Sequence, residues 1–165
     1  MKFEVDWKGD KFLVEWSDET NFENLKNVGG VAGFIFDNKG RFCIVKAKSK
    51  KAWTLPGGGP EKEDNSFEDT LIREVIEEAD LEIKNIKRLG HLKGKLKEEK
   101  DWTNYQLRYI AEVKNINPQT IDPAENSITE RKFILPKDFD KYCGWGKNGD
   151  FQLNKALKLL KKEDE

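Results

Sequence analysis

The sequence has few of the residues on which many enzyme classes depend. It contains one histidine, His91, and two cysteines, Cys43 and Cys143, which lie far apart and outside any CxxC motif. A lone histidine supplies neither a histidine-based metal site nor the relay of a serine hydrolase, and zinc sites need clustered cysteines and histidines. We therefore expect a structural His91 and two reduced thiols, as in a cytoplasmic protein.

Long apolar runs and an excess of one charge are also missing. No stretch approaches the ~20 apolar residues of a membrane span, and the first residues lack the apolar run of a secretory signal. Lysine and arginine total 30 against 31 acidic residues, which leaves a net charge of −1. This balance gives no general attraction to a polynucleotide. We expect neither a membrane nor a nucleic-acid partner, and any phosphate chemistry must come from a local site.

The composition that remains is typical of one globular domain. The 165 residues are 36% hydrophobic, 37% charged and 11% aromatic, so apolar material for a core is present. We expect a single domain over residues 1–165 with an α+β, or mixed α/β, fold. Alternating segments predict hairpins around residues 8–10 and 37–40. Further strands are expected within 83–96, near 105–113 and at 131–135, and helices at about 67–79 and 151–161.

The segment from Trp53 to Ala79 carries the chemistry. A proline-glycine turn containing Gly57, Gly58 and Gly59 precedes a helix that Ser66 or Asn65 can cap. On a helical wheel one arc is apolar and predicts the core face: Leu71, Ile72, Val75, Ile76 and Ala79. The opposite arc holds three acids: Glu74, Glu77 and Glu78. Carboxylates this close repel one another unless a cation neutralises them, and their oxygens suit Mg²⁺ or Mn²⁺.

This segment resembles the Nudix box, whose pattern is G-x5-E-x7-R-E-U-x-E-E-x-G-U with U a bulky apolar residue. Residues Arg73 to Glu78 match the core of the pattern without a gap, and Leu81 matches its last position. The resemblance implies an α/β/α sandwich with a mixed sheet, here preceded by an N-terminal β-hairpin. It also implies a hydrolase that uses a divalent metal to cleave nucleoside diphosphates linked to another group.

Two positions depart from the family pattern. Counted from Gly58, the first glutamate of the box becomes Asp64 with a one-residue insertion before Arg73; counted from Gly59, it becomes Asn65. We favour Asp64, because it keeps a carboxylate. The late glycine of the box is Asp80, and since Asp tolerates a left-handed conformation less well than Gly, we expect a different helix end.

The resemblance assigns roles to particular residues. It implies metal binding by Glu74, Glu77 and Glu78, with Asp64 as an outer ligand, and catalysis by the same glutamates with Arg73 holding them in place. Gly58, Gly59 and Trp145 are our candidates for substrate contact, Trp145 as an aromatic residue on a flexible loop at 143–149. The general base stays open between a box glutamate and loop acids: Glu98, Glu99, Asp101 and Glu130. Four lysines near the box are weaker phosphate candidates: Lys46, Lys48, Lys50 and Lys51.

These observations predict a Mg²⁺-dependent hydrolase, with Mn²⁺ as a second metal, acting on a nucleoside triphosphate or another small nucleoside-diphosphate-linked molecule. Two alternatives stay open: a nucleotide-sensing module with this fold that does not hydrolyse its ligand, and an RNA 5′-pyrophosphohydrolase. The disturbed loop before the helix motivates the first alternative, and the balanced charge weighs against the second. Dimers are common in the family, which implies a homodimer.

Overall fold

The computed structural model describes residues 1–97 and 103–162. In this part of the chain eight strands form one mixed sheet in the order β1-β2-β6-β7-β3-β4-β8, with β5 paired to β3. The pairs are antiparallel except β3 and β7, which run parallel. The strands are β1 (Lys2–Trp7), β2 (Asp10–Ser17), β3 (Val28–Phe36), β4 (Phe42–Lys46), β5 (Gly57–Gly58), β6 (Leu81–Leu96), β7 (Thr103–Ile116) and β8 (Glu130–Ile134).

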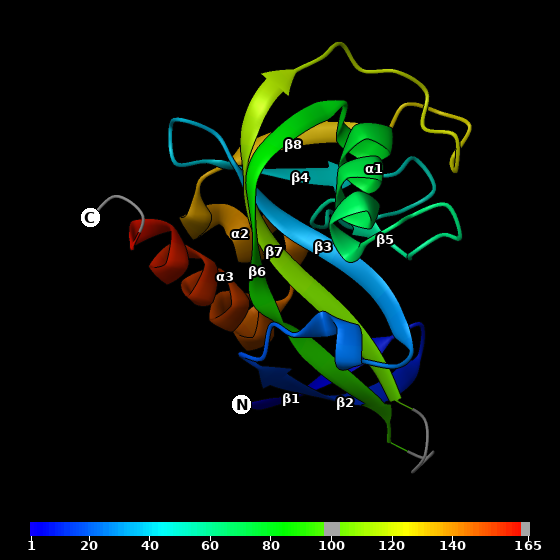
Figure 1. The fold of residues 1–165 in the computed structure, drawn as a ribbon, viewed down its shortest axis with the longest axis vertical. Coiled ribbons are helices and arrows are strands. Elements are labelled where there is room, and N and C mark those ends of the chain that lie inside the picture. The colour runs from blue at the N-terminus through cyan, green and yellow to red at the C-terminus, as the bar shows by residue number, and fades with distance from the viewer. Residues whose placement is uncertain (98–102, 163–165) are drawn as a thin grey trace.

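Helices cover both faces of this sheet. Helix α1 (Phe67–Ala79) lies on one side, and α2 (Phe139–Cys143) with α3 (Gly146–Lys161) lies on the other (Figure 1). Short 3-10 helices are η1 (Phe22–Asn24) and η2 (Pro136–Asp138). The layers confirm the expected α/β/α sandwich. No helix of residues 1–97 and 103–162 has the length and apolar character needed to cross a membrane.

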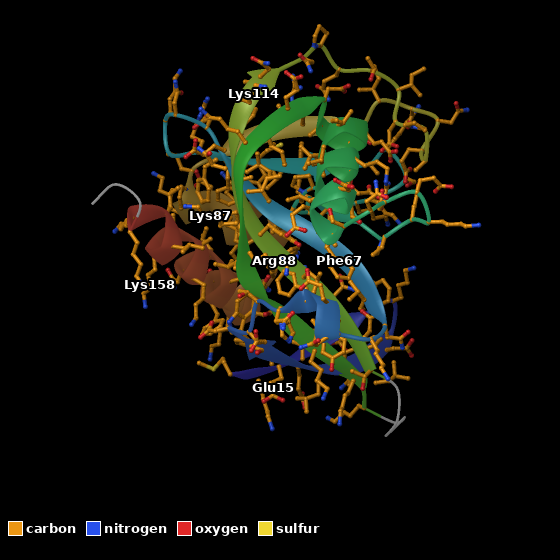
Figure 2. All side chains as sticks on the ribbon, in the orientation of Figure 1. Glu15, Phe67, Lys87, Arg88, Lys114 and Lys158 are labelled. Atoms are coloured by element: carbon orange, nitrogen blue, oxygen red, sulfur yellow. The ribbon has the colours of Figure 1, made fainter. Side chains whose placement is uncertain are left out.

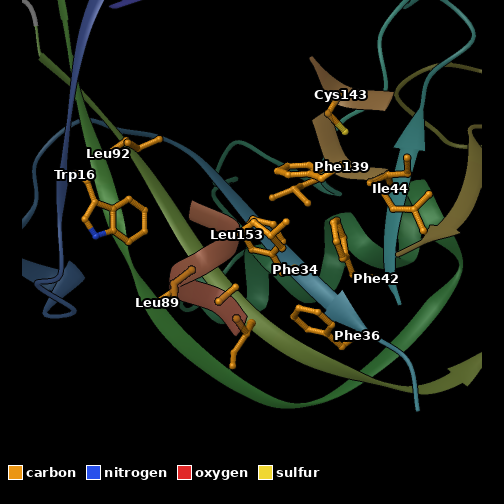
Figure 3. Packing of buried hydrophobic residues seen from close by; sticks show 14 residues of the cluster. Trp16, Phe34, Phe36, Phe42, Ile44, Leu89, Leu92, Phe139, Cys143 and Leu153 are labelled. Atoms are coloured by element: carbon orange, nitrogen blue, oxygen red, sulfur yellow. The ribbon is translucent and has the colours of Figure 1, made fainter. Parts of the chain in front are cut away.

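Two hydrophobic clusters follow from the alternation of side chains along each strand. On β3, Phe34 and Phe36 belong to the cluster beneath α2 and α3, where Phe34 packs edge-on against Phe42 and Phe139 (Figure 3). The neighbouring Ile35 belongs to the opposite cluster, beneath α1. A one-residue slip of β3 would therefore exchange the two cores.

The predicted hairpins are confirmed, and their turns have the expected chemistry. Lys8 and Gly9 both have positive φ, 52° and 87°, as a tight two-residue turn requires. The second hairpin turns at Asp37, whose carboxylate accepts hydrogen bonds from the backbone of Lys39 and Arg41. Such side-chain bonds to nearby amides favour a turn over a continued strand.

Three details of the predicted elements were wrong. The last helix begins at Gly146 rather than near residue 151, so the expected flexible loop at 143–149 does not exist. Its glycines indicated a loop, but Trp145 packs against Phe139 with ring centroids 5.3 Å apart and holds the segment on the sheet. In α1, Ile72 and Ile76 are 36% and 47% exposed instead of buried, because the helix turns its glutamates toward the glycine turn.

The expected change at the end of α1 was also wrong. Asp80 keeps the left-handed C-cap that a glycine usually occupies, with φ 50° and ψ 42°. Its carboxylate accepts hydrogen bonds from the backbone and the hydroxyl of Thr120, at 2.8 and 2.7 Å. These two bonds offset the strain of the left-handed backbone.

Candidate active site

Helix α1 is fixed at its first turn. Ser66 is the N-cap, and its hydroxyl accepts a hydrogen bond from the Asp69 amide at 3.1 Å. The Asp69 carboxylate reaches back to the Asn65 amide rather than to Ser66, a variant of the capping box. From β6, Arg88 binds Glu68 of the same turn, close to Phe67 (Figure 2). The helix is thus anchored to the sheet just ahead of its acidic residues.

Arg73 is the centre of a network of carboxylates. Its Nε and Nη2 donate to the two oxygens of Asp64 at 3.0 and 2.9 Å, and its Nη1 donates to Glu74 at 2.8 Å. Nη2 also donates to the Gly59 carbonyl, and Nη1 lies 3.5 Å from Glu77. The guanidinium holds the pKa of Asp64 well below its usual range. Arg73 therefore fixes the glutamates relative to the glycine turn.

The glycine turn closes over Glu74 and Glu78. The Gly57 amide donates to Glu78 Oε1 at 3.0 Å. A Cβ on Gly58 would overlap the Glu74 carboxylate, so a residue with a side chain does not fit there without displacing it. The absence of a side chain at Gly58 thus allows the close contact with the Glu74 carboxylate as well as the turn.

The charges of the enclosed carboxylates are only partly balanced: Arg73 pairs with Glu74 and lies near Glu77, whereas Glu78 has no cationic partner in the described part of the chain. Burial raises the pKa of the Glu78 carboxyl well above its usual range, against the opposing hydrogen bond from Gly57, and the charge of Glu74 adds to the rise. Burial likewise raises the pKa of Glu77, again with Glu74 contributing. In each case the ionised form is disfavoured until a positive charge arrives.

The comparison with protein families decides what this arrangement is. The model of the NUDIX domain matches residues 26–153, most of the chain. The chain belongs to the Nudix hydrolase family. A comparison with curated protein sequences gave no match.

Solved structures share the Nudix fold at low sequence identity. A Bacillus subtilis pyrophosphohydrolase, BsRppH (E68A mutant), is 20% identical with a TM-score of 0.70; the match covers 99% of this chain and 97% of that one. The NUDIX domain of Shewanella oneidensis NrtR, solved with ADP ribose, is 16% identical with a TM-score of 0.61 over 85% and 94% of the two chains. A Streptococcus suis ADP-ribose pyrophosphatase is 20% identical with a TM-score of 0.58, over 79% and 89%.

The structure brings together most of the site residues predicted from the Nudix box. Glu74, Glu77 and Glu78 lie on the α1 face that meets Gly58 and Gly59, and Asp64, rather than Asn65, supplies the carboxylate that meets Arg73. Asp64 accepts two further hydrogen bonds, from the Thr70 hydroxyl and from the Glu61 amide. Its visible contacts are those of an anchor for Arg73.

Other predicted residues lie elsewhere. Trp145 is on the opposite face of the sheet from α1, within the cluster beneath α2 and α3. Glu130 lies 3.4 Å from Lys46, whose ammonium also sits 5.4 Å from the Trp53 ring. Lys48, Lys50 and Lys51 are exposed in the loop that follows β4, and in the described part of the chain none of them forms an ion pair with the three glutamates. Glu98, Glu99 and Asp101 lie outside the described residues.

Asp122 was not predicted from the sequence. This carboxylate is 3% exposed, and it accepts hydrogen bonds from Thr129 and from the Ala124 amide. Its charge contributes to the raised pKa of Glu77 and Glu78, so it adds to the negative potential at the site. It lies between β7 and β8 in a segment without periodicity, which is why its position could not be expected.

The donor set fits a hard divalent cation. Glu74, Glu77 and Glu78 offer oxygen atoms, and a cation would relieve the repulsion that raises the pKa of two of them. Over residues 1–97 and 103–162, no three acidic, histidine or cysteine side chains already converge as a metal-binding group. Arg73 holds Glu74 and lies near Glu77, so metal binding there requires these side chains to reorient.

Proposed function

We propose that this Nudix domain hydrolyses a pyrophosphate linkage in a small nucleotide, either a nucleoside triphosphate or a nucleoside diphosphate linked to another group. The observation that carries the proposal is Glu78, a carboxylate enclosed beneath the glycine turn beside Glu74 and without a cationic partner of its own in the described part of the chain. Glu74, Glu77 and Glu78 would hold Mg²⁺, with Mn²⁺ as a substitute. A bound cation of this kind neutralises phosphate oxygens and lowers the pKa of a coordinated water.

The residues of the chain have separate tasks in this proposal. Gly58 and Gly59 carry no side chain where the turn meets Glu74, so a phosphate group that approached the acids would meet backbone rather than a side chain. Arg73 orients Glu74 through a charged hydrogen bond and is itself held by Asp64, so both are positioning residues. Glu78 stays close to the Gly57 amide and is the strongest of the three candidates for the metal-holding carboxylate.

The test is hydrolysis of a nucleotide panel that includes triphosphates, ADP ribose and a 5′-triphosphorylated oligonucleotide, followed as release of phosphate or pyrophosphate from the triphosphates and as release of AMP from ADP ribose. We expect Mg²⁺-dependent release from at least one small nucleotide, reduced about 100-fold or more in Glu78→Gln. Glu63→Gln, an exposed acid of the same loop, is the matched control and should retain activity.

Two outcomes would favour the alternatives. Binding of nucleotides with no turnover of any panel member would support a sensing module; the NUDIX domain of NrtR was solved with ADP ribose bound. Turnover of the oligonucleotide alone would support 5′-end processing, the reading suggested by the near full-length similarity to BsRppH. Either result would overturn the small-nucleotide proposal.

A further inference from the structure

Arg108 is a buried cation on the face of the sheet opposite α1. It lies in β7 and is 7% exposed. Its Nε donates to Gln152 of α3 at 2.7 Å, its Nη1 donates to the Leu107 carbonyl at 3.0 Å, and the guanidinium sits 5.8 Å from the centre of the Trp145 ring. All of these partners are neutral.

The charge of Arg108 has no acidic partner in the described part of the chain. Two partly buried guanidinium groups differ: Arg73 and Arg88 each bind at least two carboxylates. For Arg108, burial alone lowers the pKa to about 10, so the group is still charged near neutral pH. A buried charge without a counter-ion is costly, so an anion that reached Arg108 would be stabilised there.

Arg108 is the inner end of a polar row that leads outward. Gln106 and Asn104 precede it at alternate positions of β7, are partly exposed, and are joined by a 2.7 Å hydrogen bond. Both side chains lie over glycines of β3: a Cβ on Gly30 would overlap Gln106, and one on Gly29 would overlap Asn104. The row therefore extends along β7 from the partly exposed Asn104 to the buried Arg108. Beside Asn104 and Gln106, strand β3 has only glycines.

This row adjoins the carboxylate site at the edge of the sheet. Arg108 pairs with Ala32 of β3, and Ala32 pairs with Gly57 of β5. Two strand spacings therefore separate the backbones of Arg108 and the glycine turn, roughly 10 Å. A Cβ on Gly59 would lie 3.4 Å from the Gly29 carbonyl, so the two glycine segments touch. Because Arg108 and α1 lie on opposite faces of the sheet, a nucleotide that contacted both Arg108 and the carboxylates would have to pass around this edge.

We propose that Arg108 forms an anion subsite for a phosphate group of the substrate that is separate from the cleaved pyrophosphate. The inference rests on the proposed function for the position of the pyrophosphate. Asn104 and Gln106 line the approach, and Gln152 orients the guanidinium. The substrate class is then a nucleotide that carries a second phosphate ester, on the sugar or beyond it.

The test compares the binding of AMP with that of adenosine 3′,5′-bisphosphate, which differs by one phosphate ester. Calorimetry without metal on the full chain measures both, so a failure of hydrolysis does not affect the result. We expect the bisphosphate to bind about 10-fold more tightly to the unmodified protein and to shift the Arg108 Nε–H resonance. Arg108→Met should abolish this advantage, and Arg41→Met, which removes a surface guanidinium, should retain it.

Gln152→Glu separates anion binding from a purely structural role. The new carboxylate would face Arg108 Nε at the present 2.7 Å contact and give it an internal counter-ion. We expect an unchanged or higher melting temperature together with loss of the bisphosphate advantage. An equal affinity of the unmodified protein for the two ligands, or an advantage that survives in Gln152→Glu, would overturn the proposal. The second variant keeps the test decisive if Arg108→Met fails to fold.

Discussion

A carboxyl group enclosed beside a second carboxylate keeps its proton unless a positive charge replaces it. Glu78 is in this position, and Arg73 does not relieve it, because its bonds go to Asp64 and Glu74. The ionised form of Glu78 is therefore unfavourable in this site, and a divalent cation beside it would stabilise that form. A single side chain also positions the site. The Arg73 guanidinium binds Asp64 of the loop, Glu74 of α1 and the Gly59 carbonyl of the glycine turn.

The raised pKa of Glu78 predicts how stability depends on pH. Above the ordinary glutamate pKa the unfolded chain loses this proton while the folded protein retains it, so the free energy of unfolding falls as pH rises toward the raised pKa. Relative to the unmodified protein, Glu78→Gln should gain about 1 kcal/mol or more between pH 5 and pH 8. Urea denaturation without metal measures the difference; parallel pH profiles of the two proteins would contradict it.

The Arg73 network predicts that a conservative charge will not replace the guanidinium. A lysine has one ammonium and cannot bind Asp64, Glu74 and the Gly59 carbonyl together. We expect Arg73→Lys to lower kcat/KM by about 10-fold or more and to cost about 1–3 kcal/mol of stability. Asn65→Ala is the neighbouring control. Equal losses in both variants would show that the loop, and not the guanidinium, is responsible.

At the scale of elements, α1 is defined by its ends as much as by its apolar face. Ser66 begins it with a side-chain cap, and Asp80 ends it in a left-handed conformation held by Thr120. The Arg131 side chain of β8 also donates to the Ala79 carbonyl at 2.7 Å. The helix that carries the glutamates is thus held at its C-terminal end by two other segments, the one that contains Thr120 and strand β8.

Substitutions at Asp80 separate the two contributions to this helix end. Asp80→Ala loses the bonds to Thr120 and keeps the unfavourable φ of 50°, so we expect a loss of about 1–3 kcal/mol. Asp80→Gly loses the same bonds but relieves the backbone strain, and should cost less. Chemical denaturation gives both values. The reverse order would mean that the backbone at this position is not strained.

At the scale of the whole molecule, distant segments share one core. The N-terminal hairpin packs on the last helix, where Phe151 contacts Phe3 and Trp16 at ring distances of 5.7 and 5.9 Å. Trp16 is 7% exposed and belongs to the same cluster as Phe34 and Phe139. The chain should therefore behave as one folding unit. The expected homodimer is a question for solution measurements and stays a prediction.

Truncation of Trp16 tests this continuity. If residues 1–165 form one cooperative unit, Trp16→Ala should lower the stability of the whole protein by about 3–5 kcal/mol. Circular dichroism and tryptophan fluorescence should then give coincident transitions. Trp7→Ala, at a side chain that is 59% exposed in the same hairpin, should have a much smaller effect. A separate early transition of the hairpin would contradict a single unit.

The amino-acid sequence alone determined what depends on residues close together in the chain: the tight turns, the start of α1, and the spacing that brings Glu74, Glu77 and Glu78 to one side of a helix. It also placed the chain in its family, because the Nudix box is a local pattern. Only the tertiary structure decided that Ile72 and Ile76 are exposed, that Trp145 packs against the core just before the last helix, and that Asp122 and Arg108 are buried. Those outcomes depend on which distant segments pack against each other on the sheet, and the spacing of residues close together in the sequence does not determine such contacts.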